Sequence, residues 1–432
     1  MRNTVSAFLI QRHAELEEKS SRLSIHLSQE NIMKRQLLVI GAGFGGLWSA
    51  LSAARLLDMH DRSDVEITLL APQAELRIRP RFYEPDVRSM FAPLSDLFSA
   101  VGIRFVKGTA KSIDEQSRKV TYHDETGCSA ELDYDRLVLA SGSQLARPPV
   151  PGLKEHAFDV DQIESAAHLE NHLLSLRNQP ESRARNTVVI AGGGFTGIET
   201  ATEMPARLRA ILGAEQDVRV VIVDRGESIG AAMGDGIRPS IIEASNSLGI
   251  EWITGATVSA VDALGVSLAD GRHIESHTVI WTAGFRASPL TEQLTAQRDG
   301  QGRLHVDGNL KVRGLQNVFA AGDVAYAATD DIGNFAAMSC QHAISLGRHA
   351  GNNAAADLLG VAPTQYRQPK YVTCLDLGAW GAVYTEGWDR QLKLVKAEAK
   401  ELKTQINTMW IYPPAAERGP ALAAADPLIP VA

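Results

Sequence analysis

A strand–glycine loop–helix pattern occurs twice in this chain of 432 residues, and it constrains the fold more than any other feature. The clearer copy is Thr187–Glu203, where the apolar run Val188–Ala191 precedes Gly192, Gly194 and Gly197 in GxGxxG spacing. The first glycine permits a tight turn, the second lets a pyrophosphate approach the backbone, and the third lets the helix pack on the strand. The helix N-terminus then offers free N–H groups to the phosphates. This stretch therefore predicts a dinucleotide site.

The other copy begins at the apolar run Leu37–Ile40. Gly41, Gly43 and Gly46 follow it in the same spacing. Apolar residues then recur at helical spacing, and Val65–Leu70 has the composition of a second strand. The unit is about 30 residues long, as a strand–helix–strand dinucleotide motif should be.

The two copies differ where the second strand ends, at the position whose acidic residue normally binds the adenosine ribose. The later copy has Asp224 there, which favours NADH because a carboxylate would repel the 2′-phosphate of NADPH. Arg225 beside it keeps NADPH open as an alternative. The earlier copy has Ala71, so Gln73, Glu75 or the backbone would have to hold the ribose.

Three further apolar strands end in turns of small residues, where backbone can lie against a flat cofactor without a Cβ clash. These turns contain Ser141 and Gly142, then Gly284, then Gly322 and Asp323. A carboxylate after a glycine turn can accept a hydrogen bond from a sugar hydroxyl. The alternative is that Asp323 caps a helix N-terminus.

Four segments resemble the two-dinucleotide flavoproteins, the FAD- and NAD(P)H-dependent pyridine nucleotide oxidoreductases. They are most similar to type II NADH dehydrogenases, the single-subunit NADH:quinone oxidoreductases. The segments are Gly41–Leu47, Gly192–Glu199, Ile280–Arg286 and Phe319–Asp323. The resemblance implies that the first glycine loop binds FAD, the second binds NADH, and Asp323 contacts the ribityl or pyrophosphate part of the flavin. The residues expected to contact the cofactors are Gly41, Gly43, Phe44, Gly45, Gly46, Ser141, Gly142, Gly192, Gly194, Phe195, Gly197, Asp224, Gly284, Gly322 and Asp323.

Glu199 is an acidic residue that we expect in the first helical turn after the second glycine loop. Such a residue can simply complement the helix dipole. A structural carboxylate there would, however, partly repel the nucleotide pyrophosphate. In similar proteins this glutamate lies between the nicotinamide and flavin rings, so we expect Glu199 to be catalytic.

The acceptor side is the part of the resemblance that fits least well. Type II NADH dehydrogenases carry an Ala-Gln-x-Ala-x-Gln pattern at the quinone site. Gln341 and Ala343 match it here, whereas Cys340 and Ser345 do not. We expect Gln341 and Trp380 to line the acceptor site. Cys340 is either a buried small hydrophobe or a cysteine near the flavin, as in sulfide:quinone relatives.

These features predict an enzyme that transfers a hydride from NADH to flavin N5 and then electrons to a quinone or quinone-like small acceptor. One alternative is a soluble flavoprotein reductase of a carrier protein or pathway metabolite. Another is a non-enzymatic NADH-sensing flavoprotein. Neither HExxH nor a Cys/His cluster is present, so we expect no metal.

Composition limits which partners and which cellular compartment we expect. The net charge of −8 argues against nucleic acid as a partner. No run of about 18 apolar residues is present, so at most peripheral membrane contact is expected. Three separated cysteines suit the cytoplasm, with attachment to the cytoplasmic face of a membrane left open, as is a homodimer.

The predicted fold class is α/β, with two Rossmann-like domains in tandem-inserted arrangement and a smaller C-terminal α+β region. We expect residues 1–33 to be a poorly ordered extension, and residues 34–155 with 300–365 to form the FAD-binding domain. Residues 156–299 would form the NADH-binding domain. Residues 366–432 would form an interface or acceptor-side region.

Three local expectations concern the last third of the chain. Met338–Ala356 and Gln391–Leu402 have helical patterns, the second of them charged on all sides. The proline- and alanine-rich tail Pro413–Ala432 is expected to be poorly ordered.

Overall fold

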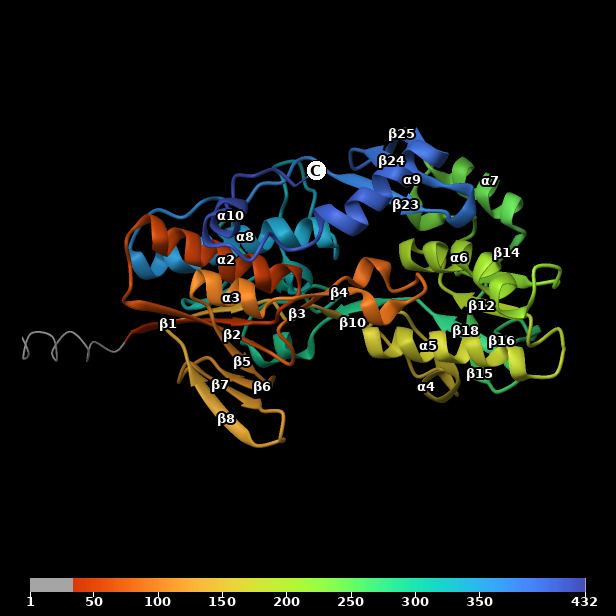
Figure 1. Cartoon of the computed structure of the whole chain (residues 1–432), viewed down its shortest axis with the longest axis horizontal. Helices are drawn as coiled ribbons and strands as arrows, with labels where there is room; N and C mark the ends of the chain where they lie inside the picture. The colour runs from red at the N-terminus through yellow and green to blue at the C-terminus, as the bar shows by residue number, and fades with distance from the viewer. Residues whose placement is uncertain (1–33, 432) are drawn as a thin grey trace, which may run out of the picture.

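Two five-stranded parallel sheets form the framework of the protein, in a computed structural model that describes residues 34–431 (Figure 1). The expectation for residues 1–33 lies outside the described residues. The first sheet has the order β21-β9-β1-β2-β5 and the second has the order β11-β18-β12-β13-β14. Their strands are β1 (Arg35–Ile40), β2 (Val65–Ala71), β5 (Arg104–Lys107), β9 (Arg136–Leu139) and β21 (Val318–Ala320), then β11 (Ala157–Phe158), β12 (Thr187–Ala191), β13 (Arg219–Val223), β14 (Ile250–Ile253) and β18 (Thr278–Trp281).

The two halves repeat one plan. In each, a glycine loop leads from the central strand into a helix, α2 (Phe44–Met59) after β1 and α6 (Phe195–Leu212) after β12. Each half also inserts a three-stranded antiparallel meander before its next parallel strand. The meanders are β6 (Thr109–Asp114), β7 (Lys119–His123) and β8 (Ser129–Asp133), and β15 (Val258–Asp262), β16 (Gly265–Leu268) and β17 (His273–Glu275). Because β21 returns to the first sheet after the second is complete, the second unit is inserted into the first, and the predicted fold class is confirmed.

A short antiparallel pair joins the halves. Strand β10 (Ser143–Leu145) follows β9, strand β19 (Phe285–Ala287) follows β18, and the two pair with Leu145 opposite Phe285. The small-residue turns that precede these strands therefore lie at the junction of the halves.

Helix α8 (Cys340–Leu359) packs along α2, and Figure 1 shows the two side by side. The approach requires glycine, because a Cβ at Gly351 would lie 1.8 Å from the carbonyl oxygen of Ser49. A Cβ at Gly347 would lie 2.5 Å from the carbonyl oxygen of Gly45. The helix expected over Met338–Ala356 is confirmed with slightly different bounds, and its N-terminus lies beside the first glycine loop.

The remaining helices and strands cover the sheets or connect them. They are β3 (Glu75–Arg77), β4 (Phe91–Pro93), α3 (Ser95–Val101), α4 (Leu153–His156), α5 (Ile163–Ser175), α7 (Arg238–Leu248), β20 (Leu304–His305) and β22 (Ala325–Tyr326). None of the helices between residues 34 and 431 is long and apolar enough to span a membrane.

The C-terminal region is an antiparallel sheet followed by helices. Its elements are β23 (Val372–Asp376), β24 (Ala382–Glu386), β25 (Gln391–Val395), α9 (Lys396–Gln405), the π-helical turn η8 (Ile406–Trp410) and α10 (Arg418–Ala424). The single helix predicted over Gln391–Leu402 is wrong in its first part, because β25 pairs with β24. A five-residue apolar alternation carries too little information to distinguish strand from helix.

The prediction of a poorly ordered tail is also wrong for the part of the tail that the structure describes. Helix α10 packs on α2 and α3, with Ala421 and Leu422 buried. Arg55 of α2 binds Asp426 at 2.7 Å. Alanine side chains are small enough to let the tail lie close to these helices, so a tail with few large hydrophobic residues is still ordered by packing.

Candidate functional site

The first glycine loop has the shape that a pyrophosphate requires. Gly41 has a φ of +108°, and a Cβ at Gly46 would lie 1.8 Å from the carbonyl oxygen of Gly41. A Cβ at Gly43, in contrast, would meet no atom within 4 Å. None of the described side chains caps the N-terminus of α2, where Phe44 is the first residue. The loop therefore presents free N–H groups to an open space, and a dinucleotide fits there.

The second glycine loop reproduces this geometry. Gly192 has a φ of +120°, a Cβ at Gly197 would lie 1.8 Å from the carbonyl oxygen of Gly192, and a Cβ at Gly194 would meet nothing within 4 Å. Helix α6, which begins at Phe195, is likewise not capped by any described side chain. The repeated motif thus builds two equivalent open loops at uncapped helix N-termini.

The ends of β2 and β13, the second strands of the two glycine-loop units, differ, as the sequence indicates. The Asp224 carboxylate accepts hydrogen bonds from the N–H groups of Gly193 at 2.6 Å and Gly226 at 2.7 Å. It thereby holds the second loop to the end of β13, and its remaining lone pairs can accept from a ribose. In the first half Gln73 is exposed, and Glu75 lies in β3 with its carboxylate 3.9 Å from Arg77.

Asp323 follows Gly322, whose φ is +67°, in the 3-10 turn η6 (Gly322–Val324) beside the first glycine loop. A Cβ at Gly45 would lie 3.2 Å from the Gly322 nitrogen. Ser143 Oγ donates to Asp323 Oδ2 at 2.6 Å, and Arg79 Nη1 donates to the same oxygen at 3.4 Å. The residue at the N-cap of this turn is Ala321, so the interpretation of Asp323 as a helix cap is wrong. Sequence patterns did not indicate Arg79 or Ser143.

The junction turns have left-handed backbone where the prediction placed small residues. Gly142 has a φ of +70° and Gly284 a φ of +81°, which side chains with a Cβ rarely adopt. The hydroxyl of Ser141 is buried and has no hydrogen-bond partner in the described part of the chain. It is available to a ligand.

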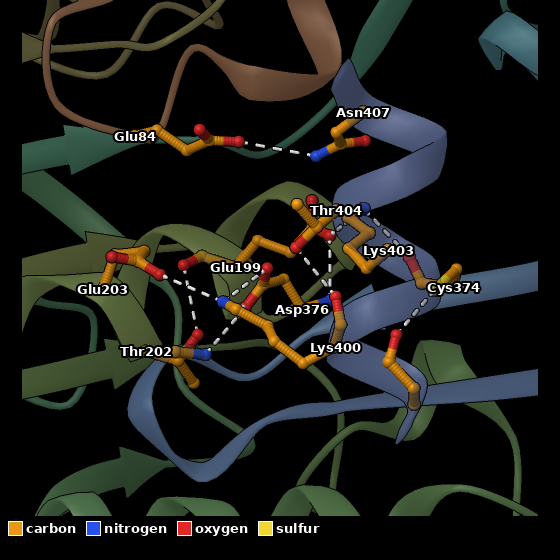
Figure 2. A network of polar contacts seen from close by, with 12 residues as sticks. Glu84, Glu199, Thr202, Glu203, Cys374, Asp376, Lys400, Lys403, Thr404 and Asn407 are labelled. Carbon is orange, nitrogen blue, oxygen red and sulfur yellow. Dashed lines mark hydrogen bonds and ion pairs between the residues drawn. The ribbon is translucent and has the colours of Figure 1, made fainter. Parts of the chain in front are cut away.

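Glu199 is the fifth residue of α6, so the expectation that it lies in the first helical turn is wrong. The dipole effect is confined to that turn, which weakens the dipole interpretation. Glu199 is only 5% exposed, and its carboxylate accepts from Lys403 Nζ at 2.7 Å and from the Asp376 N–H at 3.0 Å. Lys403 also donates to the carbonyl oxygen of Cys374 at 2.9 Å. Strand β23 and helix α9 therefore supply the partners of Glu199 (Figure 2).

A second ion pair lies beside the first. Lys400 Nζ lies 2.6 Å and 2.8 Å from the two carboxylate oxygens of Asp376, and 3.7 Å from Glu203 (Figure 2). Glu199 and Glu203 are four residues apart on α6, and the two lysines are three apart on α9, so each pair shares a helix face. Although its sequence is charged on all sides, α9 thus directs two lysines toward α6, and Lys403 is buried there.

Burial shapes the protonation of this cluster. It raises the pKa of Glu199 to about 7, against the opposing attraction of Lys403. Burial alone would lower the pKa of Lys403, but Glu199 and its other anionic neighbours raise it, so the ammonium keeps its proton. Burial also raises the pKa of Tyr83, a buried tyrosine near these carboxylates. Glu199 can therefore hold or release a proton near neutral pH.

The two predicted acceptor residues lie in different surroundings. Gln341, the second residue of α8, has a buried Oε1 that none of the described residues hydrogen-bonds. Trp380 instead donates to Glu243 of α7 at 3.3 Å, and Lys396 Nζ lies 5.4 Å from the centre of its ring. Burial raises the pKa of Cys340, which favours the unreactive thiol. These contacts place Trp380 with the second half of the chain rather than with Gln341.

Comparisons with known proteins agree with this geometry. The family model for pyridine nucleotide-disulphide oxidoreductases matches residues 35–348. An NADH dehydrogenase-like protein of Mycobacterium tuberculosis is 45% identical over 401 residues, covering 91% of this chain and 98% of the relative. The demethylphylloquinone reductase of Synechocystis is 30% identical, over 81% of this chain and 86% of the relative. The structure of NDH2 from Plasmodium falciparum in complex with NADH superposes with a TM-score of 0.73 at 14% identity, covering 91% of this chain and 97% of that one.

The family match covers both glycine loops, the Asp323 turn and the start of α8. The two open glycine loops, the inserted second unit, the family match and the 45% identical relative lead to one conclusion. This chain belongs to the pyridine nucleotide-disulphide oxidoreductase family, and it is an oxidoreductase enzyme of that family.

Proposed function

We propose that this enzyme binds FAD in its first half and oxidises NADH bound in its second half, with a quinone or quinone-like molecule as the electron acceptor. The observation that carries this proposal is the pair of equivalent open glycine loops at Gly43 and Gly194, each at an uncapped helix N-terminus. The demethylphylloquinone reductase relative supports the class of acceptor. We assign residues 34–155 and 300–365 to FAD and residues 156–299 to NADH.

FAD, when bound, accepts a hydride at N5 and returns two electrons to the acceptor. The residues of the chain orient the reactants and manage protons. The N–H groups of the two loops bind the diphosphates, and Asp323 binds the flavin chain. Asp224 binds the ribose of NADH, which favours NADH over NADPH. The net reaction takes one hydride from NADH and one proton from solvent and converts the quinone to the quinol.

Glu199 is our candidate catalytic residue because it is a buried carboxylate on the helix that begins at the NADH loop. Its pKa of about 7 lets it exchange a proton at physiological pH. Lys403 orients it at 2.7 Å. This arrangement supports a role at the ring-stacking site, where charge changes as the hydride moves.

We place the acceptor near Gln341, whose amide can donate a hydrogen bond to a quinone carbonyl. Its buried and unpartnered Oε1 can accept a hydrogen bond from a hydroxyl of the quinol product. The contacts of Trp380 do not support its place in the same pocket.

A cytoplasmic location with peripheral membrane contact is part of the same proposal. Met409 and Trp410 are 66% and 59% exposed after the C-terminal helix α9, as membrane-contacting side chains would be. Sedimentation with liposomes of anionic phospholipid tests it. A protein that stays in the supernatant at low salt contradicts membrane contact.

Anaerobic reduction followed by an acceptor panel tests the function. Purified protein should carry FAD, and NADH should bleach it. A short-chain ubiquinone or menaquinone analogue should then restore the oxidised spectrum rapidly, as followed in a stopped-flow instrument. Ferredoxin should restore it more slowly.

Gln341→Ala should slow the quinone step and leave bleaching by NADH unchanged. The matched control is Gln391→Ala, an exposed glutamine of β25. Rapid reoxidation by ferredoxin but not by quinone would move the acceptor to a carrier protein. A reduced flavin that persists with every acceptor would favour the sensing role instead.

A further inference from the structure

Arg79 is a half-buried arginine that contacts both halves of the protein. It lies in the short 3-10 turn η1 (Arg79–Arg81), between β3 and β4 of the first half. Its Nη1 donates to Ser143 Oγ at 2.9 Å and to Asp323 Oδ2 at 3.4 Å, while its Nη2 forms an ion pair with Asp161. One guanidinium therefore connects the carboxylate of Asp323, in the first half, with that of Asp161, near the start of the second half.

The second half adds a stacking contact. The guanidinium carbon lies 5.0 Å from the ring centre of Phe285, the first residue of β19. This residue follows the left-handed Gly284, and β19 pairs with β10, the strand that contains Ser143. Arg79 thus lies where β10 and β19, the strands that follow the two parallel sheets, meet.

Both carboxylates are paired with this cation. Asp161 is 5% exposed and Asp323 is 15% exposed, so neither can rely on water for its solvation. Asp161 Oδ2 also accepts from the N–H of Leu145 at 3.0 Å, which attaches it to β10. The planar fork of arginine can bind two carboxylates through different nitrogens while its face stacks on a ring, whereas lysine offers a single compact ammonium.

The location explains why a cation is needed. Asp323 is placed to contact a cofactor whose diphosphate is itself anionic. An uncompensated carboxylate would repel that diphosphate, and the charge of Arg79 offsets the repulsion. Ser143 donates to the same Asp323 oxygen at 2.6 Å and so limits its orientation.

We propose that Arg79 is a positioning residue that fixes Asp323 for FAD binding and couples the FAD site to the junction of the two halves through Asp161. This inference rests on the proposed binding of FAD by the first half. It predicts that Asp161, which lies on the junction side of Arg79, affects FAD affinity only through Arg79.

A double-mutant cycle on FAD binding tests the coupling. FAD is removed from the protein and its dissociation constant is measured by fluorescence on titration. Arg79→Gln should weaken binding by about tenfold or more, as expected for loss of a charge-assisted hydrogen bond. Asp161→Asn should weaken it by a smaller factor. In the Arg79→Gln background, Asp161→Asn should have no further effect.

The midpoint potential of the bound flavin provides a readout that a purely structural role would not move. Loss of the Arg79 charge should shift it to a more negative value, because an unbalanced Asp323 disfavours adding electrons nearby. Arg79→Lys retains the charge, so it should restore the potential while leaving the affinity below that of the wild type. Arg88→Gln is the matched control, an exposed arginine of the neighbouring turn η2 (Val87–Ser89).

The outcomes separate this inference from the proposed function. Wild-type protein that binds no FAD would refute the proposed function. Wild-type protein that binds FAD while Arg79→Gln binds it equally tightly would refute only the role of Arg79. Independent effects of Arg79→Gln and Asp161→Asn would refute the coupling. If Arg79→Gln does not fold, the FAD affinity of Arg79→Lys, alone and combined with Asp161→Asn, decides the question, and affinity equal to that of the wild type would refute the role of Arg79.

Discussion

Glu199 and Lys403 form a buried ion pair across 204 residues of sequence, with 2.7 Å between Oε1 and Nζ. Their side chains are 6% and 7% exposed. The pair joins α6, the helix that follows the second glycine loop, to the C-terminal helix α9. The C-terminal region therefore contributes a side chain, Lys403, to the candidate active site.

Removing Lys403 should destabilise the protein moderately at neutral pH. Lys403→Met deletes hydrogen bonds to Glu199 and to the Cys374 carbonyl, and we expect a loss of about 1–3 kcal/mol in the free energy of unfolding at pH 7. The loss is limited because Glu199 can take up a proton, and it should grow above pH 7. Urea unfolding measures it. Lys393→Met in β25, where the nearest carboxylate is 3.9 Å away, should change the free energy by less than about 0.5 kcal/mol.

The raised pKa of Glu199 predicts a specific pH dependence of stability. The folded state keeps the Glu199 proton up to about pH 7, whereas the unfolded state releases it near pH 4.5. Between these values the unfolded state binds fewer protons, so this group makes stability fall as pH rises, by up to about 1.4 kcal/mol per pH unit. Glu199→Gln should lack this slope. Parallel pH profiles of unfolding free energy for the variant and the wild type would contradict the assignment.

Asp224→Ala should raise the KM for NADH more than it lowers kcat. The change removes the acceptor proposed for the ribose and the two hydrogen bonds that hold Gly193 and Gly226. We expect a rise in KM of about tenfold or more, the equivalent of one hydrogen bond to a charged group. Steady-state kinetics measures it. Asp217→Ala, at an exposed aspartate just before the same strand, should leave the KM unchanged.

Gly351→Ala should separate α8 from α2 and weaken FAD binding. The new methyl group would lie 1.8 Å from the Ser49 carbonyl oxygen, which belongs to backbone and cannot rotate away. Overpacking of this kind costs about 1–3 kcal/mol or more. Thermal unfolding and FAD content measure the effect. Gly419→Ala in α10 is the control, since a Cβ there meets nothing within 4 Å.

Local sequence was sufficient for much of the fold and for both glycine loops. The positions of Gly46 and Gly197 could be predicted because the turn itself requires them, whatever the rest of the chain does. The same local logic identified the helix α8 and the end of the second strand at Asp224. It failed for β25 and for the tail that forms α10, where pairing and packing with distant residues decide the structure.

The sequence by itself determined that two strand–glycine loop–helix units repeat and that one is inserted into the other. Only the tertiary structure decided which charged residues meet. Lys403 reaches Glu199, and Arg79 joins Asp323 to Asp161, across long separations in sequence. Hydrophobic periodicity reports which positions are buried, but it does not report which buried charge lies opposite which. That depends on how α9 and the turn at Arg79 pack against the two halves, because a buried charge is tolerated only where its partner is within a few ångströms.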